Sequence, residues 1–442
     1  MKDEGAGEAA IVVDLGFGDA GKGVVTDHLV RTLGAHTVVR FCGGAQAGHN
    51  VVTRDGRHHT FAQLGAGSFV PGVRTFCSRH VVLHPTALLL EVAHLATVGV
   101  RDALERVELS EQALVITPFH QAAGRVREHA RGDAAHGSCG VGVGETVRDA
   151  LHEAREHRGS IRMRDLRDLD ALRTTGAQLR ERLRERLASE VGAPSGWSDD
   201  ERRIFDDEGV LDRWIARLRE LPRGCIVDDG EALDRLHART GAIVFEGAQG
   251  VLLDEWRGFH PHTTWSTCTF DNALELLRGR DRAVTRFGVL RTYATRHGEG
   301  PLPTEDSSLD ARLPEAHNAT HPYQGRFRRG WFDAVLTRYA LEATSGVDRL
   351  VLTHLDTIDR LAPLRIARAY ASEAGTLERL PLGAKGDLAH TAGLTALLRE
   401  VSPIYATTSP DRASALPALE EAIGSVASLV VTGPTADDVH PR

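Results

Sequence analysis

The chain has 442 residues, of which 41% are hydrophobic and 26% are charged. These shares are typical of folded globular proteins and exclude disorder over most of the chain. The formal net charge of −8 and the lack of a basic tract argue against a nucleic-acid partner. The apolar runs are too short to span a bilayer, and acidic residues and glycine follow Met1 where a signal peptide would be basic and then apolar. We therefore predict a cytoplasmic protein.

The five cysteines are scattered along the chain and show no C-x-x-C spacing. An odd, unclustered set suggests neither a disulfide framework nor a zinc site. We expect buried, unreactive thiols at Cys42, Cys77, Cys139, Cys225 and Cys268.

The first element along the chain carries a candidate phosphate site. Residues 11–15 form a short apolar run, residues 16–23 are rich in glycine, and residues 24–33 have helical spacing. A strand, a glycine loop and a helix in this order form the unit that binds phosphates. The loop nearly fits the P-loop pattern G-x-x-x-x-G-K-[S/T], and its Lys22 is one of only three lysines among 53 basic residues. The alternative is an ordinary strand-to-helix turn.

Two loop residues depart from that pattern in ways that matter for a metal ion. Gly23 stands where a hydroxyl would bind magnesium, and Asp19 places a carboxylate inside the loop. A carboxylate oxygen is itself a ligand that Mg²⁺ accepts. The sequence thus predicts that Asp19 replaces the missing hydroxyl.

A second predicted strand, residues 37–41, runs into another glycine-rich turn at residues 43–50. Gly48 and His49 lie near the end of this turn. A histidine beside a phosphate loop can donate a hydrogen bond to a phosphoryl group in transfer. The chain has 22 histidines, so a purely structural role for His49 stays open.

Residues 160–221 differ in amino-acid composition from the rest of the chain. Leucines recur at helical spacing among dense arginine and glutamate, and Ser198 to Glu201 matches a capping box that opens a helix through Leu218. We interpret this stretch as a helical insertion whose charged run is a solvated face.

Three later strands are expected at residues 242–245, 349–352 and 428–432. The second leads into Thr353-His354-Leu355-Asp356, which is similar to the [N/T]-K-x-D turn that reads guanine in GTP-binding proteins. Between the first two of these strands, residues 325–329 place three arginines in four positions, a composition suited to carboxylates and phosphates. Both segments are short, so a plain turn and a solvated basic loop remain alternatives.

Together these elements predict an α/β fold with a mostly parallel central sheet, a P-loop-like nucleotide site and a helical insertion. We expect one large domain over residues 10–433, with a disordered tail at 1–9 and a C-terminal tail at 434–442.

The motifs, taken in order, resemble the adenylosuccinate synthetase family from Ile11 to about Arg412. The specific matches are residues 18–23 (GDAGKG against GDEGKGK), 43–49 (GGAQAGH against GGHNAGH), 245–250 (FEGAQG), 295–305 (TRHGEGPLPTE against TRVGxGPFPTE), 353–356 (THLD against TKLD) and 409–412 (SPDR against GPxR). That family couples GTP hydrolysis to the joining of aspartate to inosine monophosphate (IMP).

The resemblance implies a role for each matching position. Asp19 would be the general base and His49 the general acid, with Asp19 and the carbonyl of Gly48 holding Mg²⁺. The GTP-binding residues would be Gly18, Gly21, Lys22, Gly23, Gly48, Asn50, Arg328, His354, Asp356, Thr407 and Ser409. The acceptor IMP would contact Gln46, Ala47, Cys139, Gln249, Thr264 and Arg326, and the amino acid would contact Tyr323, Gln324, Gly325 and Arg326. A homodimer is also implied, with Arg155 or Arg158 as the arginine lent to the partner's acceptor phosphate.

The departures from the family cluster around the acceptor and the amine. Cys139 replaces a threonine, Gln46 an asparagine, and His297 a valine, while Tyr323-Gln324 replaces a Thr-Thr pair. Two alternatives therefore stand beside the IMP–aspartate ligase. One is a specialised paralogue that activates another acceptor or adds another amine. The other is a GTP-binding protein without turnover, which the presence of both Asp19 and His49 disfavours.

Overall fold

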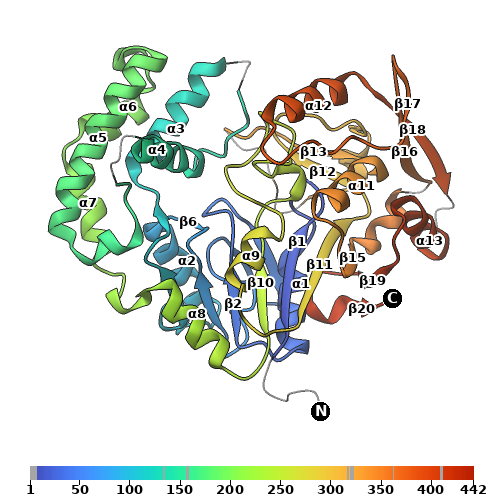
Figure 1. The fold of residues 1–442 in the computed structure, drawn as a ribbon, viewed down its shortest axis with the longest axis horizontal. Coiled ribbons are helices and arrows are strands. Elements are labelled where there is room, and N and C mark those ends of the chain that lie inside the picture. Colours follow the sequence, from blue (N-terminus) through green and yellow to red (C-terminus); the bar gives the residue numbers. More distant parts are fainter. Residues whose placement is uncertain are drawn as a thin grey trace.

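The computed structural model describes residues 7–132, 135–155, 159–315, 318, 323–361, 363–408 and 412–442. Its centre is a ten-stranded sheet with the order β20-β19-β15-β11-β1-β10-β2-β5-β7-β9 (Figure 1). The strands are β1 (Ala9–Asp14), β2 (Thr37–Arg40), β5 (Arg74–Cys77), β7 (Val107–Ser110), β9 (Ile226–Val227), β10 (Ile243–Glu246), β11 (Val284–Arg291), β15 (Arg349–Thr353), β19 (Ala427–Val431) and β20 (Val439–Pro441). All neighbours pair in parallel except β19 and β20. The prediction of a mostly parallel α/β sheet is confirmed.

Strand β1 lies in the middle of this sheet and is buried along its whole length. It pairs with β10 on one side and β11 on the other, so that Ile11 lies beside Phe245 and Arg286. Apolar residues on both faces are what a parallel strand covered by helices requires. The loops that follow β1, β2, β10, β11 and β15 consequently meet at one edge of the sheet, where ligands of open α/β sheets bind.

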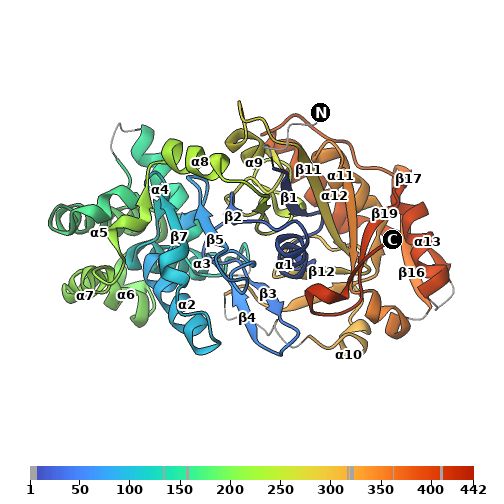
Figure 2. The ribbon, with the colours of Figure 1, turned by 90° about the horizontal axis from the view of Figure 1, so that it is seen from below.

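The helices cover both faces of the sheet and extend it at one end. They are α1 (Lys22–Thr32), α2 (Pro85–Thr97), α3 (Pro118–Arg131), α4 (Val143–Arg155), α5 (Leu169–Val191), α6 (Asp199–Asp206), α7 (Gly209–Leu218), α8 (Asp229–Ala238), α9 (Asp271–Leu276), α10 (Leu309–Arg312), α11 (Ala334–Ala343), α12 (Leu388–Glu400) and α13 (Arg412–Ile423). Figures 1 and 2 show α3 to α7 gathered at one end of the molecule. Across the part of the chain that the structure describes, no helix is both long and apolar enough to cross a membrane.

Further strands lie outside the central sheet, where they form small sheets of their own. They are β3 (His49–Val52) with β4 (His58–Phe61), β6 (Val82–Leu83) with β8 (Leu114–Val115), β12 (Ala294–His297) with β13 (Phe327–Gly330), and the sheet of β14 (Phe332–Asp333), β16 (Leu364–Ser372), β17 (Gly375–Leu377) and β18 (Ser402–Thr408). Strands β16 to β18 lie with α12 and α13 at the end remote from α5 to α7 (Figure 1).

The helical insertion differs from the prediction in two respects. The Ser198 side chain accepts a hydrogen bond from the Glu201 N–H and so caps a helix. The segment that follows forms two helices, α6 and α7, and not one. Its charged run is also more than a solvated face, because Arg182 and Arg186 of α5 pair with the buried carboxylates of Glu153 and Asp149 on α4. Buried carboxylates demand such partners. The expected leucine face is present, with Leu172, Leu179, Leu183 and Leu187 all buried.

The C-terminal segment also differs from the prediction. Residues 434–442, expected to form a tail, include β20, which pairs with β19 in antiparallel register from Leu429↔Pro441 to Val431↔Val439. The Arg442 side chain binds the Glu420 carboxylate of α13 at 3.0 Å. The sheet therefore ends in an ordered antiparallel strand.

Candidate active site

The glycine loop between β1 and α1 is built around the carboxylate of Asp14. Its Oδ1 accepts from the Gly16 N–H at 2.8 Å, and its Oδ2 accepts from the Ala20 N–H and from Lys22 Nζ, each at 2.9 Å. Lys22 is only 3% exposed, so its ammonium lies beneath the loop in an ion pair. Asp14 was not among the residues predicted for the site. The sequence does carry a signal that could have identified Asp14. It is an acidic residue at the last position of a buried strand, directly before a glycine loop.

Backbone conformation explains the loop's glycines. Gly18 and Gly21 have φ values of 94° and 91°, a region that glycine enters without steric cost. Asp19 between them also has a positive φ of 58°, which aspartate tolerates better than most residues. At the end of the loop, Thr353 Oγ1 donates to the Ala20 carbonyl at 2.8 Å. The tip of β15 is thereby joined to the glycine loop.

Gly23 lacks the P-loop hydroxyl because the structure leaves no room for one. A Cβ at this position would stand 2.5 Å from the Asn50 carbonyl oxygen and 3.1 Å from the carbonyl carbon of His49 on β3. The first turn of α1 thus packs directly on the strand that carries His49. The Asn50 amide itself faces β4, where its Oδ1 accepts from Thr60 Oγ1 at 2.7 Å.

We expect Gly23→Ser, which would restore the P-loop hydroxyl, to lower the free energy of unfolding by about 1–3 kcal/mol through overpacking against β3. Urea unfolding measures the change. Gly393→Ser is the matched control, because Gly393 is also helical and a Cβ there would meet nothing within 4 Å. A Gly23→Ser protein as stable as the wild type would contradict the packing explanation.

The Asp19 side chain is half-buried at the mouth of the loop. Among the residues that the structure describes, the His297 ring is its side-chain neighbour, with Nε2 3.6 Å from Asp19 Oδ2. Arg291 Nε donates to the Asp19 main-chain carbonyl at 2.5 Å, so the loop is held from β11 while the carboxylate is left to meet a ligand. The His297 ring packs on Phe327, with the ring centroids 4.7 Å apart.

His49 is the buried partner of a second carboxylate. Its Nδ1 lies 2.7 Å from Glu246 Oε1 at the end of β10, and Glu246 Oε2 accepts from the Ala66 N–H at 3.0 Å. The Arg40 guanidinium lies 3.8 Å from the same carboxylate. Burial lowers the pKa of His49, with Glu246 opposing the shift. Burial would raise the pKa of Glu246, but its contacts with His49, with the Arg40 guanidinium and with the Ala66 N–H outweigh burial, so this pKa is lowered.

Two glutamines face the glycine turn of residues 43–44. The Oε1 atoms of Gln46 and Gln249 are both buried and have no hydrogen-bond partner within the described residues. They lie 3.0 Å and 2.8 Å from where a Cβ would stand on Gly44 and Gly43, respectively. Ala47 closes the turn through its N–H bond to the Gly44 carbonyl. Unpaired buried amide oxygens are costly, so the site is shaped to accept hydrogen bonds from a ligand.

The segment expected to read a purine base follows β15. His354 has a φ of 61°, and its Nδ1 lies 2.9 Å from Thr353 Oγ1. Burial lowers the pKa of His354 well below its ordinary value, so the ring is neutral. Asp356 is exposed at the start of a 3₁₀ helix, Leu355–Leu361, and Thr407 is exposed on β18. Ser409 lies outside the described residues.

The arginine segment is organised by Glu305. Arg328 Nη1 lies 2.7 Å from Glu305 Oε2, and the same guanidinium donates to the carbonyls of Gly298 and Gly300. Arg326 is 62% exposed in its side chain and contacts the other Glu305 oxygen at 3.2 Å. Arg328 is thus committed to the 298–300 turn, whereas Arg326 is open to a ligand.

The expected acceptor and amine residues lie on two further loops, which we term the acceptor loop (residues 137–142) and the amine loop (residues 323–326). Cys139 is half-buried in the first, and burial raises the pKa of its thiol. In the second, the Tyr323 ring packs on α3, with its centroid 5.4 Å from that of His129. Gly325, also in the amine loop, has a φ of 85°. Thr264, which was expected to contact the acceptor, is half-buried and follows β10 in the chain. Arg155 ends α4 in an exposed position, and Arg158 lies outside the described residues.

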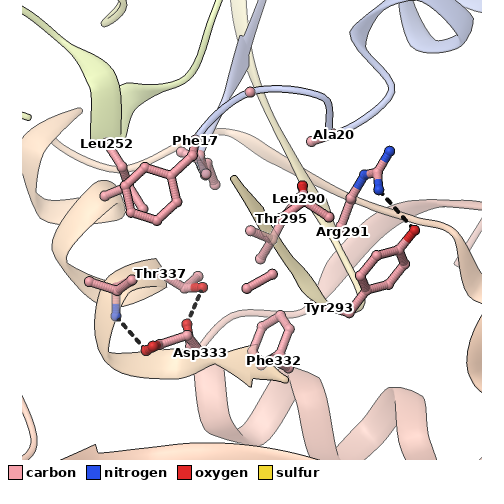
Figure 3. Close-up of a pocket in the computed structure, with 15 residues that line it drawn as sticks. Phe17, Ala20, Leu252, Leu290, Arg291, Tyr293, Thr295, Phe332, Asp333 and Thr337 are labelled. Atoms are coloured by element: carbon pink, nitrogen blue, oxygen red, sulfur yellow. Dashed lines mark hydrogen bonds between the residues drawn. The ribbon is translucent and has the colours of Figure 1, made fainter. Parts of the chain in front are cut away.

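Figure 3 shows a pocket behind the glycine loop. Phe17 and Ala20 of the loop line one side with Leu252 next to Phe17, and Phe332 lies across from them (Figure 3). The lining is mainly apolar, although the polar residues Arg291, Thr295, Asp333 and Thr337 also reach it.

Glycine-rich loops gathered at the carboxyl edge of a parallel sheet are typical of α/β nucleotide-binding proteins. A family model described as adenylosuccinate synthetase matches residues 11–422. The adenylosuccinate synthetases of Halorhodospira halophila and Alkalilimnicola ehrlichii are 33% and 34% identical, with 99% and 96% of this chain and 99% and 95% of theirs covered. The chain belongs to the adenylosuccinate synthetase family and is a ligase of that type.

Solved structures show the same fold. A fully ligated adenylosuccinate synthetase from Plasmodium falciparum superposes with a TM-score of 0.77 at 21% identity, covering 99% of this chain and 100% of that one. The succinoaminodeoxyadenylate synthetase PurZ of cyanophage S-2L, bound to dGMP and dATP, superposes with a TM-score of 0.59 at 19% identity, covering 99% and 95%.

Proposed function

We propose that this chain joins L-aspartate to IMP at the expense of GTP, through a 6-phosphoryl intermediate, to give adenylosuccinate, GDP and phosphate. One observation carries the proposal. The glycine loop presents the Asp19 carboxylate at the sheet edge where β3 also brings His49, its Nδ1 bound to Glu246. A base and an acid beside a phosphate loop are what activation of a carbonyl by phosphoryl transfer requires.

The proposed reaction has two steps, phosphoryl transfer to the purine O6 and displacement of phosphate by the amine, and different residues act in each. Asp19 accepts the N1 proton of the purine while O6 attacks the γ-phosphorus and GDP departs. Because Nδ1 of His49 is bound to Glu246, Nε2 is the ring nitrogen left for the phosphoryl group, and a nearby anion favours its protonated, donating form. The amine then displaces phosphate at C6, which completes the C–N bond. The orphan oxygens of Gln46 and Gln249 suit hydrogen bonds from the purine edge.

The donor set at the loop suits Mg²⁺. No hydrogen bond from the described residues occupies the Asp19 carboxylate, and the Gly48 carbonyl is a second hard oxygen next to His49. In the described chain, no three histidine, cysteine or acidic side chains form a metal cluster. Mg²⁺ is commonly held by one or two carboxylates together with substrate phosphates. When bound, the ion would neutralise charge on the phosphates.

A specialised paralogue is the second candidate function. Cys139 in the acceptor loop and the Tyr323 ring against α3 both change the places where acceptor and amine would bind. The cyanophage enzyme, which is similar in fold, was solved with dGMP and dATP. A dGMP acceptor, an ATP donor and amines other than aspartate therefore belong in the test.

We expect phosphate release from GTP to require IMP and an acidic amine, with GTP preferred over ATP because Asp356 can accept from the guanine N–H groups that adenine lacks. Leaving the Asp356 carboxylate unpaired once a bound base has excluded water from it costs about 1–3 kcal/mol, equivalent to a preference of roughly 5- to 150-fold. Phosphate release is measured across IMP and dGMP, GTP and ATP, and a panel of amino acids.

Asp356→Ala should erase the preference for GTP, whereas Asp359→Ala, on the same 3₁₀ helix, should retain it. Equal catalytic efficiency with ATP would contradict the role of Asp356. Turnover with another amine, and not with aspartate, would establish the paralogue. Nucleotide binding without turnover under every combination would refute both.

A further inference from the structure

The Tyr323 side chain is held on three sides by the helical end of the molecule. Its ring stacks on His129 of α3 with an interplanar angle of 29° and a centroid separation of 5.4 Å. The Arg125 guanidinium lies over the ring, 5.2 Å from its centroid, and the hydroxyl donates to Glu201 Oε1 at 3.3 Å. We term these four residues the Tyr323 cluster.

The acceptor loop is fastened to the same cluster. Arg125 Nε donates to the Gly140 carbonyl at 3.1 Å, and a Cβ on Gly140 would lie 3.0 Å from Tyr323 Cδ2. Gly140 has a φ of 69°, so glycine is needed both for the turn and for contact with the ring. One arginine thus holds the main chain of the acceptor loop and the aromatic ring of the amine loop together.

The cluster is anchored in the interior. The Glu201 carboxylate is only 4% exposed and sits in the first turn of α6, whose N-cap is Ser198. A buried carboxylate needs donors, and the Tyr323 hydroxyl supplies one at 3.3 Å with Arg125 Nη1 4.0 Å away. The anchor therefore comes from the helical insertion and not from the sheet that carries the glycine loop.

The 298–300 turn completes the assembly on the other side. The Gly298 N–H donates to the Arg326 carbonyl at 3.0 Å, and a Cβ on Gly137 would lie 3.2 Å from the Glu299 nitrogen. The acceptor loop, the amine loop and this turn consequently share contacts. Arg326, at the end of the amine loop, keeps its side chain exposed.

We propose that Tyr323 is a positioning residue that locks the amine loop to the acceptor loop through α3 and α6, so that the two loops order together. Its ring does not contact the amine. Binding of the acceptor at residues 137–142 then also orders the loop that carries Gln324 and Arg326. This consequence for substrates rests on the proposed function, whereas the lock itself is a property of the protein alone.

Hydrogen exchange of the full-length protein tests the lock without any substrate. Tyr323→Ala should raise the exchange rates of amides in residues 323–328 about tenfold or more, because it removes a hydrogen bond to a charged group and a cation–π contact. Tyr323→Phe, which keeps the ring, should give a smaller rise. Arg173→Ala is the control, since it breaks an exposed ion pair with Asp212 in the same helical layer and leaves the cluster intact. Exchange in Tyr323→Ala within twofold of the wild type would overturn the proposal.

Hydrogen exchange measured with added IMP distinguishes the lock from the proposed reaction. In the wild type, IMP should slow exchange in both residues 137–142 and residues 323–328, and in Tyr323→Ala it should protect only the first. Protection of both segments in that variant would overturn the proposal. If Tyr323→Ala shows the substrate-free effect but the wild type shows neither IMP protection nor phosphate release, the lock stands and the proposed function fails.

A kinetic double-mutant cycle distinguishes positioning from a general loss of structure. With IMP, GTP and L-aspartate, Tyr323→Phe and Glu201→Ala should each raise the KM for aspartate several-fold with little change in kcat, and the double variant should resemble either single one. Glu201→Gln, which keeps an acceptor for the hydroxyl, should restore the wild-type KM. Multiplying effects in the double variant, or a fall in kcat alone, would overturn the proposal.

Discussion

Asp19→Asn should abolish phosphate release while GTP binding largely survives. The carboxylate stands in the glycine loop with the His297 ring beside it, and the loop's shape depends on Asp14 and Arg291 instead. Asparagine keeps the side-chain volume and tolerates the positive φ as aspartate does, so the fold should be unaffected. Loss of a general base costs about 10²–10⁴-fold in rate.

Turnover is measured as phosphate release with IMP and aspartate, and affinity by calorimetric titration of GTP without acceptor. Asp55→Asn provides the same substitution at an exposed carboxylate in the β3–β4 turn and should leave both unchanged. An Asp19→Asn protein that keeps more than about a tenth of the wild-type rate would exclude the role as base.

Glu246→Gln should cause the largest combined loss of activity and stability. The carboxylate binds His49 Nδ1, the Ala66 N–H and Arg40 in the interior, so its removal leaves a buried guanidinium without its counter-charge. Breaking a buried pair costs about 3–5 kcal/mol in the free energy of unfolding. We also expect a fall in turnover of about 10²-fold, because the His49 ring loses the partner that fixes its orientation. His49→Asn should lower turnover similarly and affect nucleotide affinity less.

The stability loss should depend on pH in a defined direction. Folding lowers the pKa of Glu246, so the wild type gains stability above the ordinary glutamate pKa and loses it as the pH falls through the lowered value. Urea unfolding should therefore show a wide gap between wild type and Glu246→Gln at neutral pH that narrows in acid. A gap that stays constant would show that the carboxylate charge is not what stabilises this site.

Local patterns in the sequence determined the strands, the glycine loop and the family. A short apolar run, then glycines and then a helical repeat can be recognised in a short stretch of sequence. This is possible because the steric limits on φ and ψ act between neighbouring residues. Hence β1, α1 and the loop holding Asp19 lie where the sequence predicts, and the arginine-rich chain made Lys22 informative. The leucine face of α5 was equally visible, since its period matches the helix.

Only the tertiary structure decided which side chains meet. Glu246 is 197 residues from His49, and Tyr323 is 122 residues from Glu201. Such pairs form because the parallel sheet brings separate strand ends to one edge and the insertion packs beside it, which no local pattern encodes. The same reason explains why residues 434–442 became β20: an exposed sheet edge offers unpaired N–H and C=O groups, and the chain end satisfies them. Packing likewise directed the Tyr323 ring to His129 of α3, a contact that no local pattern around residue 323 predicts.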